Sequence, residues 1–154
     1  MRGQFSTHRP KLIMREAYVN LTPQPGVWVT AFVCISNIGE TAAHIIDSCI
    51  EFVIVEDQKY IKTPQADGRH DLNAKEPIQP GETHKFTVTS FAHKWDEKTL
   101  GHYSQHIKFF LAGHVVYADE IGIRRAMAFW RKYHRMKQRF EKIYLEENEY
   151  EYSN

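Results

Sequence analysis

The sequence predicts an all-β protein, an antiparallel β-sandwich, and three observations support this fold class. Runs rich in β-branched and aromatic residues recur along the chain. Turns that contain Pro or Gly separate these runs, and no long helical segments alternate with them. In the clearest run, residues 27–36, apolar side chains occupy every second position. This period of two is typical of a strand that buries one face.

Six main strands and their turns can be placed in order along the chain. We expect strands at residues 11–22, 27–36, 43–55, 84–91, 105–118 and 123–133, with a shorter strand at 59–62. Turn residues lie between them at 23–26, 37–41, 80–81 and 119–122. Beyond Tyr133 the pattern is ambiguous, because apolar residues from Met127 to Ile143 also recur at helical spacing. A short C-terminal helix at 132–147 and a non-helical tail both stay open.

The length and charge pattern indicate one domain with a charged C-terminal tail. We divide the 154 residues into an N-terminal stub at 1–10, the sandwich at 11–134 and a basic-then-acidic tail at 135–154. Residues 124–142 contain eight Lys or Arg and one acid, whereas residues 146–151 contain four acids and no base. The net charge of +1 argues against binding of nucleic acid or membranes through overall charge.

Three stretches of sequence together resemble a group of known proteins. They are an opening segment at 5–12, a strand and turn of the form Asn-x-Gly-x-Thr-x-Ala at 37–43, and a closing hairpin at 113–125. The combination resembles uncharacterised bacterial membrane-anchored proteins with a C-terminal immunoglobulin-like β-sandwich domain. This resemblance implies an immunoglobulin-like sandwich of six to eight strands in a cell-envelope setting, with no assigned catalytic residues. The anchor of these relatives is absent from this sequence, so the chain alone is expected to be soluble.

Six residues in these stretches are expected to have structural roles: Asn37, Gly39, Thr41, Gly113, Asp119 and Gly122. Gly39 is expected to let the chain reverse, and Thr41 to hydrogen-bond the turn backbone. Gly113 lies inside a strand, which predicts a bulge or a large side chain packed over it, such as a cross-strand aromatic ring. We expect Asp119 to cap its own hairpin, with Gly122 in the left-handed conformation.

The sequence contains no recognisable catalytic centre, so we predict that the protein is not an enzyme. There is no Gly-x-Ser-x-Gly motif for a nucleophile and no glycine-rich phosphate loop. His102 and His106 have the spacing of a helical metal pair, but no Cys or carboxylate completes a known ligand pattern. We therefore predict no metal site and no cofactor. The two cysteines lie in apolar runs and are expected to be buried free thiols.

Two surfaces are candidates for binding a partner. Alternation predicts four outward apolar side chains that could serve self-association or an unknown protein partner: Trp28, Phe32, Phe110 and Val116. The second surface is basic, with Trp130 and Tyr133 interleaved. Its candidate anion-binding residues are Arg124, Arg125, Arg131, Lys132 and Arg135, with Lys137 and Arg139 further along the chain.

The predicted function is a non-catalytic interaction or sensing module of the bacterial cell envelope. The alternative is peripheral binding to anionic lipid or nucleic acid through residues 124–139. A strand divides these charges, since Arg125 and Arg131 share one face while Arg124 and Lys132 share the other. We therefore expect no nucleic-acid partner, and contact with a membrane only through the anchor of the relatives.

Overall fold

The computed structural model contains β-strands as its only regular elements within the described residues, which are 8–58, 61–66, 70–96, 99–100, 107–143 and 152–153. The strands are β1 (Leu12–Val19), β2 (Trp28–Asn37), β3 (His44–Gln58), β4 (Ile61–Ala66), β5 (Thr83–Lys94), β6 (Ile107–Ala118), β7 (Arg124–His134), β8 (Arg139–Lys142) and β9 (Tyr152–Ser153). The all-β prediction is confirmed, and the main predicted strands are all present close to their expected bounds.

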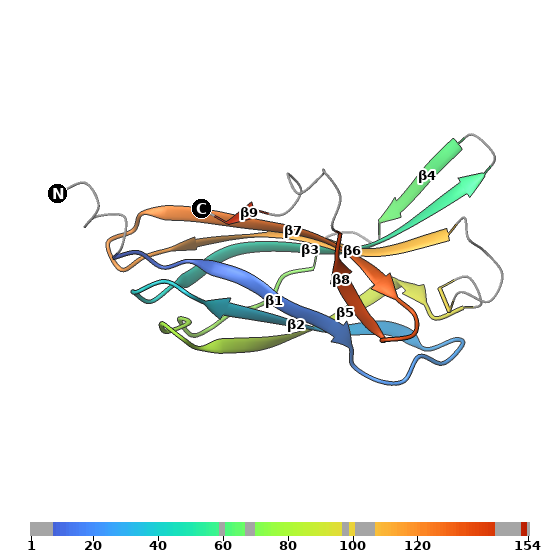
Figure 1. Cartoon of the computed structure of the whole chain (residues 1–154), viewed down its shortest axis with the longest axis horizontal. Coiled ribbons are helices and arrows are strands. Elements are labelled where there is room, and N and C mark those ends of the chain that lie inside the picture. Colours follow the sequence, from blue (N-terminus) through green and yellow to red (C-terminus); the bar gives the residue numbers. More distant parts are fainter. Residues whose placement is uncertain are drawn as a thin grey trace.

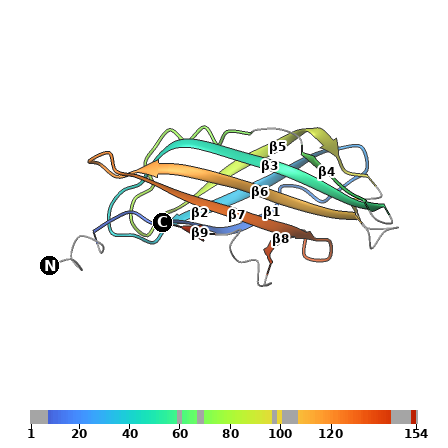
Figure 2. The same cartoon turned by 90° about the horizontal axis from the view of Figure 1, so that it is seen from above.

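All nine strands belong to one antiparallel sheet in the order β4-β3-β6-β7-β8-β1-β2-β5, with β9 paired to β7. The sheet folds over on itself, so that an upper half of β3, β6 and β7 lies over a lower half of β1, β2 and β5 (Figure 1). Seen from above, the strands of the upper half run side by side (Figure 2). The short strand β8 joins the halves, because it pairs with β7 on one side and with β1 on the other.

The predicted immunoglobulin-like sandwich is therefore wrong, because a sandwich needs two separate sheets. The seven strands from β3 to β5 instead form one sheet that is nearly closed into a barrel. On the side opposite β8, residues 70–78 run along the seam between β3 and β5. His70 bridges to Ile50 and Ile78 bridges to Ala43. Leu72 and Ile78 of this segment are buried in the core, so the seam is partly filled.

Residues 124–142 form a hairpin, and the C-terminal helix, one of the two alternatives left open by the sequence, is absent from residues 132–143. β7 ends at His134, a turn follows, and β8 returns at Arg139–Lys142. Phe140 is buried in the core, whereas Met136 in the turn is 78% exposed. The helical spacing of these two residues therefore does not reflect a shared buried face. Residues 144–147 of the expected helix lie outside the described part, and β8 itself lies within the stretch assigned to the tail.

A core of aliphatic and aromatic side chains fills the barrel. The inward-facing residues of β2 are all fully buried: Val29, Ala31, Val33 and Ile35. Near β8 the core is aromatic, with Phe109 at its centre. Its ring centroid lies 5.5 Å from that of Phe140 and 5.8 Å from that of Trp95. Aromatic pairs of this geometry contribute about 0.5–1.5 kcal/mol each beyond the area they bury, so Phe140 anchors β8 to the aromatic core beside β6 and β7.

Two side chains from the upper half complete the hydrogen bonding of β1. Among the described strands, β8 pairs only with Ala17 and Tyr18 of β1, so the start of β1 lacks a strand partner on that side. There the Leu12 N–H donates to the buried Tyr117 hydroxyl at 3.3 Å. Arg131 Nη2 donates to the Met14 carbonyl at 2.6 Å. Buried backbone groups require partners, and these two side chains replace the missing strand.

The turn between β2 and β3 is fixed by Asn37, which is fully buried. Its side-chain amide donates to the carbonyls of Thr41 and Ile78, each at 2.8 Å. Its side-chain carbonyl accepts from the N–H groups of Gly39 at 2.9 Å and Lys11 at 3.2 Å. The Thr41 hydroxyl finds no partner among the described residues, so Thr41 holds the turn through its carbonyl. Asn37 thereby ties the start of β1, its own turn and the segment before β5.

Gly39 and Gly113 both lie where another part of the chain approaches closely. A side chain at Gly39 would collide with the backbone of residues 9–11. A Cβ at Gly113 would lie 2.5 Å from the Cys49 carbonyl oxygen and 3.0 Å from Phe129 Cζ. Phe129 is the residue opposite Gly113 on β7, so a cross-strand aromatic ring does cover this glycine. Neither glycine adopts a positive φ; space, not chain reversal, excludes a side chain here.

The hairpin between β6 and β7 is capped by Asp119. Its Oδ1 atom accepts from the N–H groups of Ile121 at 3.1 Å and Ile123 at 2.9 Å. Gly122 has a φ of 90°, in the left-handed region that favours glycine. This turn therefore has the local chemistry that its sequence predicts.

Replacing Asn37 by Ala is expected to lower the free energy of unfolding by about 3 kcal/mol, because it leaves several buried backbone groups without partners. Urea unfolding followed by circular dichroism measures the change. The matched control is Asn20→Ala, at a half-buried position beside the β1–β2 loop, which should change stability by less than about 0.5 kcal/mol. Equal effects of the two substitutions would contradict the role of Asn37.

Candidate functional site

The structure does not bring the predicted apolar patch together. Trp28 and Phe32 lie on the outer face of β2 in the lower half, whereas Phe110 and Val116 lie on β6 in the upper half. Phe110 is buried against Trp130, with 5.0 Å between the ring centroids. Of the four side chains, Trp28 is the most exposed, at 43%. The four residues therefore belong to two separate surfaces.

The predicted anion-binding residues fall into two groups along β7. Arg124 and Arg125 begin the strand, beside the β6–β7 hairpin, whereas Arg131 and Lys132 lie near its other end. A strand rises about 3.3 Å per residue, so roughly 20 Å separates the two groups. Arg135 follows in the β7–β8 turn. One small anionic group cannot contact both ends of β7.

Arg131 is buried, and its guanidinium contacts the protein backbone. The residue is 7% exposed. Its Nη2 atom lies 2.6 Å from the Met14 carbonyl and its Nη1 atom 3.5 Å from the Arg15 carbonyl. These carbonyls belong to β1 just beyond the residues that pair with β8. The structure thus places this predicted anion-binding residue in the joint between the two halves.

A recess of about 440 Å³ opens beside Arg131, between β1 and the β7–β8 hairpin. Its charged lining residues are Arg15, Arg131, Lys137, Arg139 and Lys142, with the acids Glu16 and Glu141. Four of the basic residues are exposed, and we call the surface that they form the cationic recess: Arg15, Lys137, Arg139 and Lys142. β1 supplies the first of these, the β7–β8 turn the second, and β8 the other two.

One ion pair lies within the cationic recess. Lys137 Nζ is 2.9 Å from Glu141 Oε1. The hydrogen bond from Lys137, together with nearby positive charges, holds the pKa of Glu141 below its ordinary value. Glu141 is therefore ionised at neutral pH and offsets the charge of Lys137. Among the described lining residues, three cations of the recess then face one further acid, Glu16, so this part of the surface is net positive: Arg15, Arg139 and Lys142.

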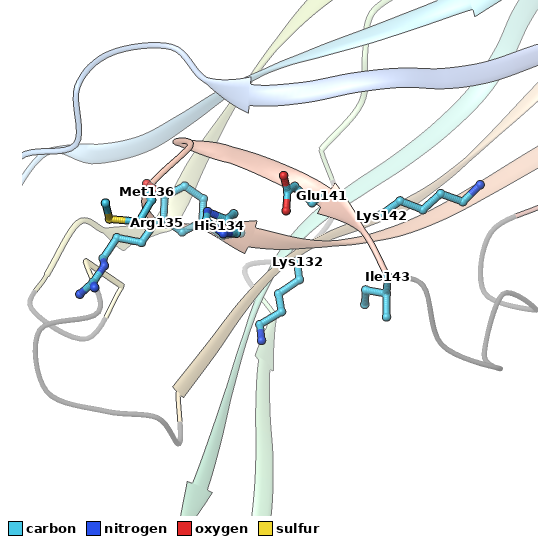
Figure 3. A pocket seen from close by; sticks show the side chains of 8 residues that line it. Lys132, His134, Arg135, Met136, Glu141, Lys142 and Ile143 are labelled. Carbon is cyan, nitrogen blue, oxygen red and sulfur yellow. The ribbon is translucent and has the colours of Figure 1, made fainter.

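A second recess, of about 470 Å³, lies on the other side of the hairpin (Figure 3). The side chains of Lys132 and Arg135 extend away from the hairpin there. Burial raises the pKa of Tyr133, which also lines this recess, to about 12. Glu141 and Lys142 line both recesses, so the hairpin is a charged ridge between them.

Sequence reasoning missed Arg15 and Lys142. Arg15 lies more than a hundred positions before Arg131, and the two meet only because β8 pairs with β1. Lys142 fell within the predicted tail. The order Arg139, Phe140, Glu141 has one apolar residue between two charged ones, which is the pattern of a short half-buried strand. That pattern is the one local signal for this site.

Two further predictions concern metal binding and the cysteines. No group of three His, Cys, Asp or Glu within them could hold a metal ion, and His102 and His106 lie outside the described part. No disulfide joins the two cysteines, and Cys49, which was expected to be buried, is half-buried. Cys34 is buried, and its burial, with the nearby charge of Glu16, raises the pKa of its thiol. In the same part of the chain, no helix has the length and apolar character that a membrane crossing requires.

Fold and site together define an all-β protein with one curled sheet and a cationic recess beside its short joining strand. The sequence matches no protein-family model and no curated protein. Among solved structures, ApaA from Bordetella pertussis is similar at a TM-score of 0.42 and 17% identity, over 79% of this chain and 91% of that one. Spo0M, a sporulation control protein from Bacillus subtilis, is similar at a TM-score of 0.41 and 17% identity, over 79% of this chain. The chain spans about half the length of Spo0M, 47%. This distant structural similarity to bacterial proteins identifies no family.

Replacing Arg131 by Met is expected to destabilise the protein by about 2–3 kcal/mol, because the buried Met14 carbonyl loses its donor. The stability of Arg131→Lys should lie between that of Arg131→Met and that of the parent protein, since an ammonium cannot reproduce the planar guanidinium. Urea unfolding measures both. The control, Lys132→Met, changes the exposed neighbour and should cost less than about 0.5 kcal/mol. If Arg131→Met were as mild as the control, Arg131 would not join the halves.

Proposed function

We propose that this protein is a non-catalytic interaction module that binds an anionic group of its partner in the cationic recess. The observation that supports the proposal is the convergence of Arg15, Arg139 and Lys142 from two different strands around one hollow. Each of these side chains is exposed and therefore accessible to a ligand, unlike the buried Arg131. Guanidinium and ammonium groups donate charge-assisted hydrogen bonds to phosphate and carboxylate oxygens.

Buried contacts hold the strands that form the recess in fixed positions. Arg131 and the buried ring of Phe140 hold the two strands that carry the exposed cations. A site on strands fixed by buried contacts loses less conformational freedom on binding than a site on a free tail. The ion pair of Lys137 and Glu141 competes weakly with a ligand, because an exposed pair is worth little in water.

The non-catalytic part of the proposal follows from the absence of a nucleophile motif or a phosphate loop in the sequence. The cell-envelope setting, which the sequence resemblance implies, stays a prediction. The proposal replaces the alternative of binding through residues 124–139 with a compact site on β1 and β8, since the two basic groups of β7 are too far apart for one anionic group.

Sodium tripolyphosphate is expected to bind and to shift the backbone amide resonances of residues 15–18 and 137–142 in two-dimensional NMR. Arg139→Glu should weaken binding about tenfold, because reversing a charge about 4 Å from an anion in water changes the interaction by about 2 kcal/mol before screening. Lys142→Glu should act similarly from the neighbouring position.

The matched control is Lys108→Glu, on β6 in the upper half, which should leave the affinity within about twofold. Circular dichroism spectra confirm that all variants are folded. Binding that shifts resonances elsewhere, or that responds equally to Lys108→Glu and Arg139→Glu, would refute the proposed site.

A further inference from the structure

The strands of the lower half and β8 carry more basic than acidic residues, although the net charge of the protein is only +1. β1, β2, β5 and β8 together contain five basic and two acidic residues: Arg15, Lys85, Lys94, Arg139, Lys142, Glu16 and Glu141. β3 alone contains four acidic residues and no Lys or Arg: Asp47, Glu51, Glu56 and Asp57. The near-zero total therefore conceals an excess of basic residues on β1, β5 and β8 taken together and an acidic strand, β3, while β7 in the upper half is itself basic.

A row of side chains leads from the cationic recess across the outer face of the lower half. Arg139 on β8 lies opposite Tyr18, Tyr18 lies opposite Phe32, and Phe32 lies opposite Thr87 on β5. Residues that are opposite each other project from the same face of a sheet. The neighbours of Tyr18 along β1, Ala17 and Val19, are buried, so this row lies on the outer face.

Aromatic rings and cations adjoin along this face. The ring centroids of Tyr18 and Phe32 are 5.4 Å apart, with planes inclined at 62°. Lys85 Nζ lies 4.4 Å from the centroid of the Phe32 ring. Lys94 Nζ lies 4.6 Å from the Trp28 ring, and Trp28 shares the outer face of β2 with Phe32. The face thus places a positive charge beside its exposed or half-exposed rings.

We infer that the anionic partner is a single-stranded nucleic acid, an inference that rests on the proposed function. Its phosphates bind in the cationic recess and along Lys85 and Lys94, while its bases stack on Tyr18, Phe32 and Trp28. Proteins that bind single strands without sequence preference combine a positive track with aromatic side chains in this way. The charge of this face complements the phosphate backbone, and its rings complement the bases.

The aromatic rings of this face distinguish a single-stranded nucleic acid from other anionic ligands. In a duplex the bases stack on one another and cannot stack on Tyr18 or Phe32. A lipid headgroup contacts only the cations, so it leaves the half-buried rings of Tyr18 and Phe32 without a partner. A base that reaches Phe32 displaces Lys85, whose flexible stem lets its amine follow the phosphate. Base stacking is stronger than an exposed cation–π contact, so the exchange is favourable.

Fluorescence anisotropy with a labelled oligothymidylate of about twelve nucleotides tests the inference at low salt and at about 0.15 M salt. The full chain should bind the oligomer at least about tenfold more tightly than a duplex of equal length, and tighter than vesicles with anionic headgroups. Tyr18→Leu and Phe32→Leu should each weaken oligomer binding about tenfold. Tyr18→Phe keeps the ring and should retain the affinity. Weaker binding at higher salt is expected for a phosphate contact.

Tripolyphosphate binding distinguishes failure of this inference from failure of the proposed function. The Leu variants should bind tripolyphosphate as the parent does, whereas Arg139→Glu should weaken both ligands and Lys108→Glu neither. If Tyr18→Leu binds the oligomer like the parent, or if duplex or vesicles bind equally well, the single-strand inference is overturned while the recess stands. If neither tripolyphosphate nor the oligomer binds, both proposals are overturned. Unfolding curves show whether each variant is folded. Tyr18→Phe keeps the ring, so comparison with Tyr18→Leu shows whether weaker binding comes from loss of the ring.

Discussion

The contact between the Arg131 guanidinium and the Met14 carbonyl joins the two halves of the protein where no described strand does so. β8 is only four residues long, and it reaches β1 at Ala17 and Tyr18. Beyond that point the backbone of β1 needs donors and acceptors from elsewhere, because a buried carbonyl or N–H without a partner is costly. Arg131 supplies the donor at Met14, and the Tyr117 hydroxyl accepts from the N–H of Leu12.

The pairing of β8 with both β7 and β1 also determines where the charged residues lie. Because β8 sits between β7 and β1, Arg139 and Lys142 stand beside Arg15 and form the cationic recess with Lys137. The register of β8 on β1 also sets Arg139 next to Tyr18, where the aromatic row begins. In a sandwich with a free basic tail, these residues would have no fixed relation. The proposed binding surface is thus a consequence of the joint that holds the sheet together.

The strands could be predicted from the sequence because alternation is a local property of the chain. In β2 the apolar side of the pattern is the buried side, as expected. Strand order is not local, and the sandwich was wrong for that reason. β8 contains a single large apolar residue, Phe140, and its spacing from Tyr133 and Met136 fits a helix as well as a hairpin. The hairpin is selected by burial of Phe140 in the aromatic core and by the pairing of β8 with β7 and β1, which are not local properties of the sequence.

The candidate sites show the same limit. Alternation correctly assigned Phe110 to the outer face of β6, but it cannot show that Trp130 covers it. The basic segment 124–139 made Arg131 a candidate anion-binding residue, whereas burial and the β1 carbonyls give Arg131 a structural position. Arg15 and Lys142 come together only because β8 pairs with β1. No local sequence pattern predicts that pairing.

The most direct test of this account is the detection of backbone nuclear Overhauser contacts between β8 and β1 in solution. The account predicts contacts between Phe140 and Ala17, and also between Phe140 and Tyr133, since these residues are opposite each other in the sheet. Both sets must be present in the same folded molecule. Contacts from Phe140 to Tyr133 alone, or neither set, would mean that β7 and β1 are edges of separate sheets. That result would contradict the single curled sheet and the binding surface built on it.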